Sequence, residues 1–389
     1  MIYLCSIYFF TFTFIKTEIL NRLSAWRKPW QVVYLKICIV SKFPPIQGGI
    51  ASKTYWLARG LAEAGLEVHV VTNALAVEDD YKIGSCGKDF LLPEGIFIHN
   101  IEQETPWHIP YSKLFQEKLL NKLLGVCNQY KIDLIDSHYL IPYGIAAFLA
   151  GTITGIPYIV RHGGSDLAKF WDKGLLNELL KRTLSNASAI VTDKTDLGIL
   201  NNNLVNLPRY VPDERYFHPE AKEENQISFA YIGKINYYWQ HKGLDRILSY
   251  WDGFSFDSSL FFLAQGKGKA DFLAQYKPDK VKFLDFIPPW KMPSFLQKID
   301  FLFHLVNDNP IPDFSNIVVE AVACGAKILT DNPSAFICYE EYFDVNKYVL
   351  SVDNFSINHN ITKAEQPLKI KYATYIKQNI ELYRKACAL

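Results

Sequence analysis

The sequence predicts an α/β protein with two doubly wound domains that face a cleft. Between about residues 35 and 330, short apolar runs alternate with segments whose apolar residues recur at helical spacing. This alternation is typical of parallel sheets covered by helices. It is interrupted once, at 207–219, by a segment with three prolines, mixed charge and no periodicity. A chain of 389 residues also suits two domains better than one.

Composition narrows the class of protein further. Apolar residues make up 49% of the chain, which favours globular domains over disorder. The formal net charge is +1, which argues against nucleic acid as the main partner. The seven cysteines include no C-x-x-C pair, so we expect reduced thiols in the cytoplasm and no metal site built on cysteine.

Residues 1–30 are predicted to be an extension with an apolar and then a basic part. Residues 1–15 carry no charge, and the first charged residue is Lys16. As a helix this run would span about 22 Å, less than the ~30 Å of a hydrocarbon core. A misplaced start codon or disordered tail, an interfacial anchor and a secretory signal all remain open. If the run touches a membrane, the basic residues after it favour a cytoplasmic location for the rest.

Residues 31–206 are predicted to form the first domain. The apolar run LKICIV (35–40) is expected to be a buried parallel strand, followed by the loop SKFPPIQGG and a helix over 50–64 that ends at Gly65. A strand over 67–72 completes a Rossmann-like β-loop-α-β unit. Further strands are predicted at 133–137, 158–161 and 189–192, and helices at 113–130, 142–151 and 175–185. Residues 75–112 give only weak strand signals.

Residues 207–219 are predicted to be a linker, and residues 220–369 the second domain. Strands are expected at 226–232, 260–264, 281–284, 301–305 and 327–330, with helices at 243–251, 292–297 and 316–324. A tight turn is the favoured interpretation of Gly266-Lys267-Gly268. The segment 370–389 carries an amphipathic helix at 370–386.

One carboxylate stands out on an otherwise apolar helix start. The stretch after Pro312-Asp313-Phe314-Ser315 continues as NIVVEAVACG, in which Glu320 is the only charged residue. A buried carboxylate is costly unless it has a partner. Glu320 therefore indicates a ligand near the amino terminus of this helix.

Gly48 and Gly49 lie between the first predicted strand and its helix. A glycine pair at this place lets backbone N–H groups approach an anion at a helix amino terminus. Taken alone, the pair is better explained by an ordinary turn between strand and helix. The chain contains no G-x-G-x-x-G, so a dinucleotide site is not indicated.

Two lysines follow one predicted strand and precede one predicted helix. Lys234 ends YIGK, and Lys242 belongs to QHKGL. Cations held in a dry cleft stabilise the charge that a diphosphate leaving group gains in a transition state. Two solvated surface lysines are the alternative.

Two histidines lie at the ends of predicted parallel strands, where α/β sheets place their ligands. His162 follows YIVR and leads into Gly163-Gly164-Ser165-Asp166, and His138 follows DLIDS. A histidine there can hydrogen-bond a sugar hydroxyl or assist proton transfer. A structural histidine in a loop is the alternative for both.

Taken together, these segments resemble the retaining GT-B glycosyltransferases of family 4, over about residues 35–345. The similar motifs occur in the family's order: the Pro-Pro-x-x-Gly-Gly loop, the His-Gly-Gly-Ser-Asp run, the lysine pair, Phe283-Leu284-Asp285-Phe286-Ile287-Pro288 and the helix that carries Glu320. The resemblance implies a GT-B fold whose last helix crosses back to the first domain. It implies catalytic roles for His162, Lys242, Lys234 and Asp313, and an acceptor side with His138 and Asp166. The implied donor-binding residues are Gly48, Gly49, Gly233, Phe286, Ile287, Ser315, Asn316, Ile317 and Glu320.

The chain departs from the family pattern at three of these motifs. The first glutamate of the family motif falls at Pro312, and Asp313 is the nearest carboxylate. Lys234 takes the place of an arginine, so a single ammonium group replaces a guanidinium that could donate two parallel hydrogen bonds. Asp285 takes the place of a glycine. Pro312 leaves a contact to the transferred sugar open. Either Asp313 supplies that contact after a loop shift, or the donor preference differs or the activity is impaired.

The activity that the resemblance implies is transfer of a sugar from a nucleoside diphosphate to a glycan or lipid-linked acceptor, with retention of configuration, in surface polysaccharide biosynthesis. No metal or other cofactor is expected, because Lys234, Lys242 and helix amino termini would stabilise the diphosphate. We expect a cytoplasmic protein, and the apolar start and the helix with Lys113, Lys118 and Lys122 leave peripheral contact with the inner membrane open.

Other activities remain in competition. A nucleotide-sugar epimerase or hydrolase would share the phosphate site without an acceptor. A catalytically degenerate subunit would explain the proline at position 312. A Rossmann-type oxidoreductase is disfavoured by the missing fingerprint.

Overall fold

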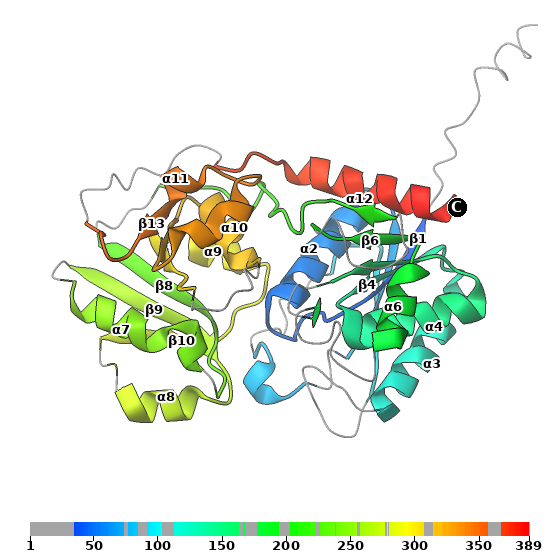
Figure 1. The fold of residues 1–389 in the computed structure, drawn as a ribbon, viewed down its shortest axis with the longest axis horizontal. Helices are drawn as coiled ribbons and strands as arrows, with labels where there is room; N and C mark the ends of the chain where they lie inside the picture. Colours follow the sequence, from blue (N-terminus) through cyan, green and yellow to red (C-terminus); the bar gives the residue numbers. More distant parts are fainter. Residues whose placement is uncertain are drawn as a thin grey trace, which may run out of the picture. The chain divides into compact units, whose positions relative to one another are not determined.

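The computed structural model describes residues 35–73, 77–84, 92–102, 113–162, 166–167, 177–193, 203–221, 226–237, 239–254, 257–276, 278, 280–306, 314–356 and 367–388. Residues Lys36–Leu389 form one compact unit that contains two parallel sheets (Figure 1). We call the part around the first sheet, up to residue 205, the first lobe, and the part from residue 226 to residue 356 the second lobe.

The first lobe is built on a sheet with the strand order β3-β2-β1-β4-β5-β6-β7. Its strands are β1 (Lys36–Val40), β2 (Glu67–Thr72), β3 (Ile96–Asn100), β4 (Leu134–His138), β5 (Tyr158–Arg161), β6 (Ala189–Val191) and β7 (Leu204–Val205). Its helices are α2 (Gly49–Glu63), α3 (Lys113–Tyr130), α4 (Ile145–Thr154) and α6 (Asn177–Ser185), with short turns η1 (Asp79–Tyr81) and η2 (Leu140–Gly144). All described strand pairs are parallel.

The second lobe is built on a sheet with the strand order β10-β9-β8-β11-β12-β13. Its strands are β8 (Ile227–Lys234), β9 (Ser258–Gln265), β10 (Val281–Leu284), β11 (Phe301–Phe303), β12 (Lys327–Thr330) and β13 (Val349–Ser351). Its helices are α7 (Leu244–Asp252), α8 (Lys269–Tyr276), α9 (Met292–Leu296), α10 (Asn316–Ala323) and α11 (Val345–Tyr348), with turns η3 (Trp239–Lys242) and η4 (Pro333–Tyr339).

The apolar strands form the two cores, as the continuous apolar runs predicted. Side chains of β1 and β4 pack with α3 and α4 in the first lobe. In the second lobe the core is rich in aromatic rings, with Phe229 stacked on Phe301 at a centroid distance of 5.0 Å and Trp251 against Phe229 at 5.5 Å. Such pairs stabilise a core beyond the apolar area they bury. The prediction of two doubly wound α/β domains is therefore confirmed.

The last helix, α12 (Tyr372–Cys387), packs against α2 and β4 of the first lobe, as predicted for a helix that crosses back (Figure 1). A buried polar network holds it there. Arg161 Nε donates to both carboxylate oxygens of Asp136 at 2.9 Å, Arg161 Nη2 donates to Asn379 Oδ1 at 2.7 Å, and the Tyr383 hydroxyl donates to Asp136 Oδ2 at 2.6 Å. Burial acts to raise the pKa of Asp136, but Arg161 outweighs it and holds that pKa well below its ordinary value.

Several elements differ from the sequence-based expectation. The weak signals at 75–112 contain the edge strand β3, and α8, α11, η4, β7 and β13 were not predicted. The helix expected over 142–151 begins at Ile145, because η2 occupies the residues before it. The stop at Gly65 is confirmed by its φ of 89°, and Gly266-Lys267-Gly268 forms the predicted turn.

Candidate functional site

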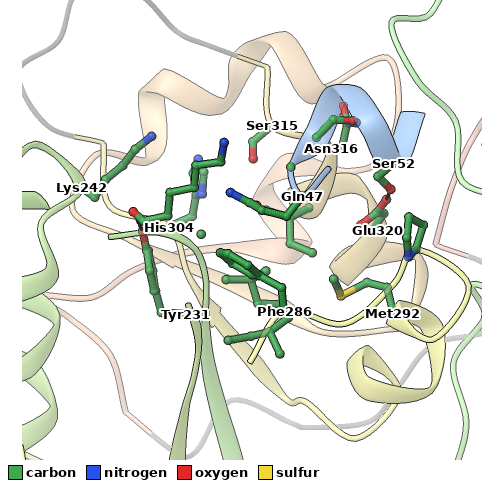
Figure 2. Close-up of a pocket in the computed structure, with 18 of the residues that line it drawn as sticks. Gln47, Ser52, Tyr231, Lys242, Phe286, Met292, His304, Ser315, Asn316 and Glu320 are labelled. Carbon is green, nitrogen blue, oxygen red and sulfur yellow. Dashed lines mark hydrogen bonds between the residues drawn. The ribbon is translucent and has the colours of Figure 1, made fainter. Parts of the chain in front are cut away.

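A cavity of about 440 Å³ lies at the carboxyl-terminal ends of β1, β8 and β11 (Figure 2). Ile46–Gly49 line it from the loop after β1, Gly233 and Lys234 from the end of β8, and His304–Val306 from the loop after β11. In each sheet the strand order reverses at this point, between β1 and β4 and between β8 and β11. Such switch points are where open α/β sheets bind ligands.

Glu320 lies on α10 at one end of the cavity. The side chain is only 3% exposed, because the rest of the helix is apolar and packed into the second lobe. Its Oε1 accepts hydrogen bonds from the Tyr210 hydroxyl at 2.9 Å and from Ser52 Oγ at 3.3 Å. Burial raises the pKa of Glu320 to about 7, although both donors act to lower it. The carboxyl is therefore poised between its two protonation states near neutral pH.

The amino terminus of α10 faces the glycine loop of the first lobe. Asn316 Nδ2 donates to the carbonyl oxygen of Gly49 at 2.8 Å, and both residues line the cavity together with Ser315 and Ile317. The backbone N–H of Ser315 donates to the Tyr339 hydroxyl at 2.7 Å. This N–H group must release Tyr339 before it can bind an anion at the helix terminus.

Two cations lie on the other side of the cavity. The half-buried Lys234 ends β8, and its Nζ lies 4.9 Å from the ring centroid of Tyr81. Burial lowers the pKa of Lys234 to about 8, the charge of Lys242 adds to this effect, and Glu78 opposes it. The exposed Lys242 ends η3 and lines the same cavity. An anion between the two ammonium groups would relieve their repulsion.

The loop before α2 requires a glycine at position 48. Gly48 has a φ of 119°, a backbone conformation that residues with a Cβ rarely adopt, and a Cβ there would lie 3.6 Å from Lys234 Cε. The carbonyl oxygen of Gly48 accepts from the N–H of Ser52 at 3.1 Å and so starts α2. The loop can therefore bring backbone close to a ligand beside Lys234.

Phe286 and Ile287 line the cavity after β10, and their role in donor binding stays a prediction. The Phe286 side chain is buried. The preceding Asp285, which takes the place of a family glycine, is not among the residues that line the cavity and accepts a hydrogen bond from the side-chain amide of Gln265.

Three predicted residues lie outside the lining of this cavity. His138 Nδ1 is 3.1 Å from Thr54 Oγ1, and His162 Nε2 is 2.6 Å from Thr192 Oγ1. Asp166 accepts from the backbone N–H groups of Leu140 at 2.8 Å and Leu167 at 2.9 Å. All three side chains are buried at the carboxyl-terminal side of β4 and β5. Their acceptor-side and catalytic roles remain predictions, and Asp313 lies outside the described residues.

Gln47 and His304 are among the residues of the cavity that were not predicted from the sequence. Gln47 precedes the glycine pair, and His304 follows β11. Burial and the charge of Lys242 lower the pKa of His304 to about 4, so the imidazole is neutral at pH 7. The rule that ligands bind after parallel strands would have selected His304, whereas nothing in the local sequence distinguishes Gln47.

Two further kinds of feature bear on the class of site: metal-binding groups and membrane-spanning helices. Among the described residues, no group of three or more His, Cys, Asp or Glu side chains is placed to hold a metal ion. None of the described helices is both long enough and apolar enough to cross a membrane.

Comparison with known proteins agrees with this architecture. Residues 48–198 match the model of the glycosyl transferase 4-like domain. The chain is 23% identical over 313 residues to the uncharacterized glycosyltransferase MJ1178 of Methanocaldococcus jannaschii, covering 77% of this chain and 79% of that protein.

Solved structures share the fold at low sequence identity. Anabaena HepE in complex with UDP-glucose superposes with a TM-score of 0.57 and 14% identity, over 91% of this chain and 92% of that one. The UDP-GlcNAc 2-epimerase of Methanocaldococcus jannaschii superposes with a TM-score of 0.56 and 12% identity, over 90% of this chain and 99% of that one. Residues 48–198 therefore match a glycosyl transferase 4-like domain, and the chain as a whole has the two-sheet architecture of the GT-B fold.

Proposed function

We propose that this glycosyltransferase transfers a sugar from a nucleoside diphosphate to a saccharide or lipid-linked acceptor, with retention of configuration. The observation that carries the proposal is the arrangement of the cavity. Lys234 and Lys242 lie on one side, and the amino terminus of α10 with the buried Glu320 lies on another. This is a site for an anion joined to a hydroxyl-bearing group, and its volume is in the range of small-molecule pockets.

In the proposed reaction, the bond between the sugar anomeric carbon and the diphosphate oxygen breaks. A bond from an acceptor hydroxyl oxygen to that carbon forms on the same face, and the hydroxyl proton is released. Negative charge grows on the departing diphosphate, so Lys234 and Lys242 would stabilise the transition state more than the bound donor. Glu320 would accept hydrogen bonds from the ribose hydroxyls, for which it must be ionised.

Support for a nucleotide-sugar donor comes from a structural neighbour, because HepE has been solved with UDP-glucose. A role in surface polysaccharide biosynthesis and a cytoplasmic location belong to the same proposal. The five cysteines among the described residues are free thiols, which supports a reducing compartment. Epimerisation of a nucleotide sugar is the second candidate, favoured by the shared fold of the UDP-GlcNAc 2-epimerase.

The test is a panel of UDP-, GDP-, ADP- and dTDP-sugars offered to the full chain, with affinity and slow release of free sugar as readouts. We expect selective binding of one donor class, and its loss in Lys242→Ala and Glu320→Gln. Lys298→Ala is the matched control, because Lys298 is an exposed lysine of the second lobe outside the cavity. Binding of no nucleotide sugar would contradict the proposal. Formation of an epimer with the nucleotide still attached would favour the second candidate.

A further inference from the structure

Gln47 has a buried side-chain amide with an unpaired nitrogen, as far as the described residues show. Its side chain is 5% exposed, and its Nε2 has no hydrogen-bond partner among the described residues. The backbone around it is fixed, because the Gln47 N–H donates to the carbonyl oxygen of Tyr81 at 3.0 Å. Buried polar groups are normally paired, so an unpaired one at a cavity wall calls for an explanation. A partner supplied by a ligand provides it.

Both orientations of the Gln47 amide suit the same kind of ligand. The nitrogen and oxygen of a glutamine side chain are assigned from the surrounding hydrogen bonds. Exchanging them would present an acceptor to the cavity in place of the donor. A group able to both donate and accept, such as a sugar hydroxyl, satisfies either orientation.

His304 contributes a second neutral polar group from the other lobe. Figure 2 shows Gln47 and His304 among the side chains that line the same cavity. The imidazole is neutral at pH 7 because burial and the charge of Lys242 oppose its protonation. A neutral imidazole has one donor and one acceptor nitrogen. Its edge contact with Phe336, at a centroid distance of 5.8 Å, supports the ring from one side.

The charged groups near this pair act on different parts of a ligand. Lys234 and Lys242 are suited to the diphosphate, and Glu320 is suited to a pair of ribose hydroxyls. Gln47 and His304 carry no charge, so they match uncharged oxygens better than phosphate. The transferred sugar is the uncharged, hydroxyl-rich part of a nucleotide-sugar donor.

We propose that Gln47 and His304, one from each lobe, form the subsite that binds the hydroxyl groups of the transferred sugar. This inference rests on the proposed function, because it assigns a part of the same donor. Since the two residues come from opposite lobes, the sugar would bridge the lobes at this point. Donor specificity would then depend on a residue of the first lobe as well as on the second.

The test compares each nucleotide sugar of the panel with its own free nucleoside diphosphate. Affinities are measured by calorimetry for the full-length wild type, Gln47→Leu and His304→Ala. We expect both variants to bind the selected nucleotide sugar at least fivefold more weakly and to bind the free nucleoside diphosphate within twofold of the wild type. We also expect Gln47→Leu to melt at the same temperature as the wild type or higher, because it removes an unpaired buried amide.

Gln297→Leu is the matched control. Gln297 is similarly buried, at 8% exposed, but its Nε2 donates to the carbonyl oxygens of Tyr216 at 3.2 Å and His218 at 3.3 Å. This variant should melt at a lower temperature and keep the wild-type preference for the nucleotide sugar. If Gln47→Leu binds both ligands as the wild type does, or weakens both equally, the sugar subsite is wrong. Failure of the wild type to bind any nucleotide would instead overturn the proposed function.

Discussion

The Tyr210 hydroxyl donates a hydrogen bond to Oε1 of Glu320 at 2.9 Å, and both side chains are buried. Tyr210 belongs to the segment 207–219 between the lobes, whereas Glu320 lies on α10 at the cavity. Burial raises the pKa of Tyr210 well above its ordinary value, so the phenol remains a donor at every working pH. The protonation of Glu320 is thus tied to the segment that joins the lobes.

Replacing Tyr210 by phenylalanine should weaken nucleotide binding in a pH-dependent way. A hydrogen bond to a charged group contributes about 1.5–3 kcal/mol, so its loss should raise the pKa of Glu320 by about one to two units. At pH 7 we therefore expect about a five- to fiftyfold weaker affinity for the nucleoside diphosphate, recovering to within about twofold of the wild type by pH 9. Calorimetry across pH 6–9 measures this change in affinity.

Tyr250→Phe is the control, because it removes an exposed hydrogen bond to Asp353 and should leave the dependence of affinity on pH unchanged. If Tyr210→Phe showed the same dependence of affinity on pH as the wild type, the account would be contradicted.

The wild-type affinity itself should have a maximum between two titrations. In the proposed site Glu320, with a pKa of about 7, would accept hydrogen bonds from ribose hydroxyls only when ionised, so affinity should rise as the pH increases through 7. Lys234, with a pKa of about 8, attracts the diphosphate only when protonated, so affinity should fall above pH 8. Lys234→Arg should abolish the alkaline decrease, because arginine keeps its charge. An alkaline decrease that survives in Lys234→Arg would assign it to another group.

Glu320 should also make stability depend on pH. Its pKa of about 7 in the folded protein exceeds the ordinary value of 4.5, so the folded state holds its proton more tightly than the unfolded state. This tighter proton binding adds about 3 kcal/mol to the free energy of unfolding below pH 4.5. The contribution is lost as the pH rises from 4.5 through 7. The free energy of unfolding of Glu320→Gln should not fall in this way, because glutamine does not titrate. Thermal melts should therefore show a larger advantage of Glu320→Gln over the wild type at pH 8 than at pH 5; an equal difference at both values would refute this.

Much of the fold follows from short-range patterns, because strands such as β1 and helices such as α2 have apolar residues at the spacing of their own geometry. β3 was missed because it lies at the sheet edge and carries polar residues among its apolar ones. β7 is only two residues long and is too short to show any period.

Less of the site than of the fold could be predicted from the sequence. Glu320 was found because a carboxylate contrasts with its apolar helix. Gln47 was not, since its unpaired amide is a property of the packed cavity. The Asp136–Arg161 pair binds residues of α12 more than two hundred positions away, and no local pattern reports such a contact.

Close packing between α2 and α12 makes Gly60 sensitive to a single added carbon. A Cβ on Gly60 would collide with Ile376 and the Tyr372 hydroxyl. We expect Gly60→Ala to lower the melting temperature by several degrees and to increase proteolysis near α12. Gly125→Ala is the matched control, because Gly125 is an exposed helical glycine of α3 with open space around its Cβ position. That variant should be neutral or stabilised by up to about 1 kcal/mol. Equal melting temperatures for both variants would show that α12 does not pack closely here.

The central claim is that Lys242 helps to hold the diphosphate of a nucleotide-sugar donor in the cavity between β1, β8 and β11. The most direct test is the affinity of the full-length wild type and of Lys242→Ala for the nucleoside diphosphate of the selected donor and for the corresponding nucleoside. The account predicts at least a tenfold loss for the diphosphate and no change for the nucleoside in Lys242→Ala. Equal diphosphate affinity in the two proteins would contradict it.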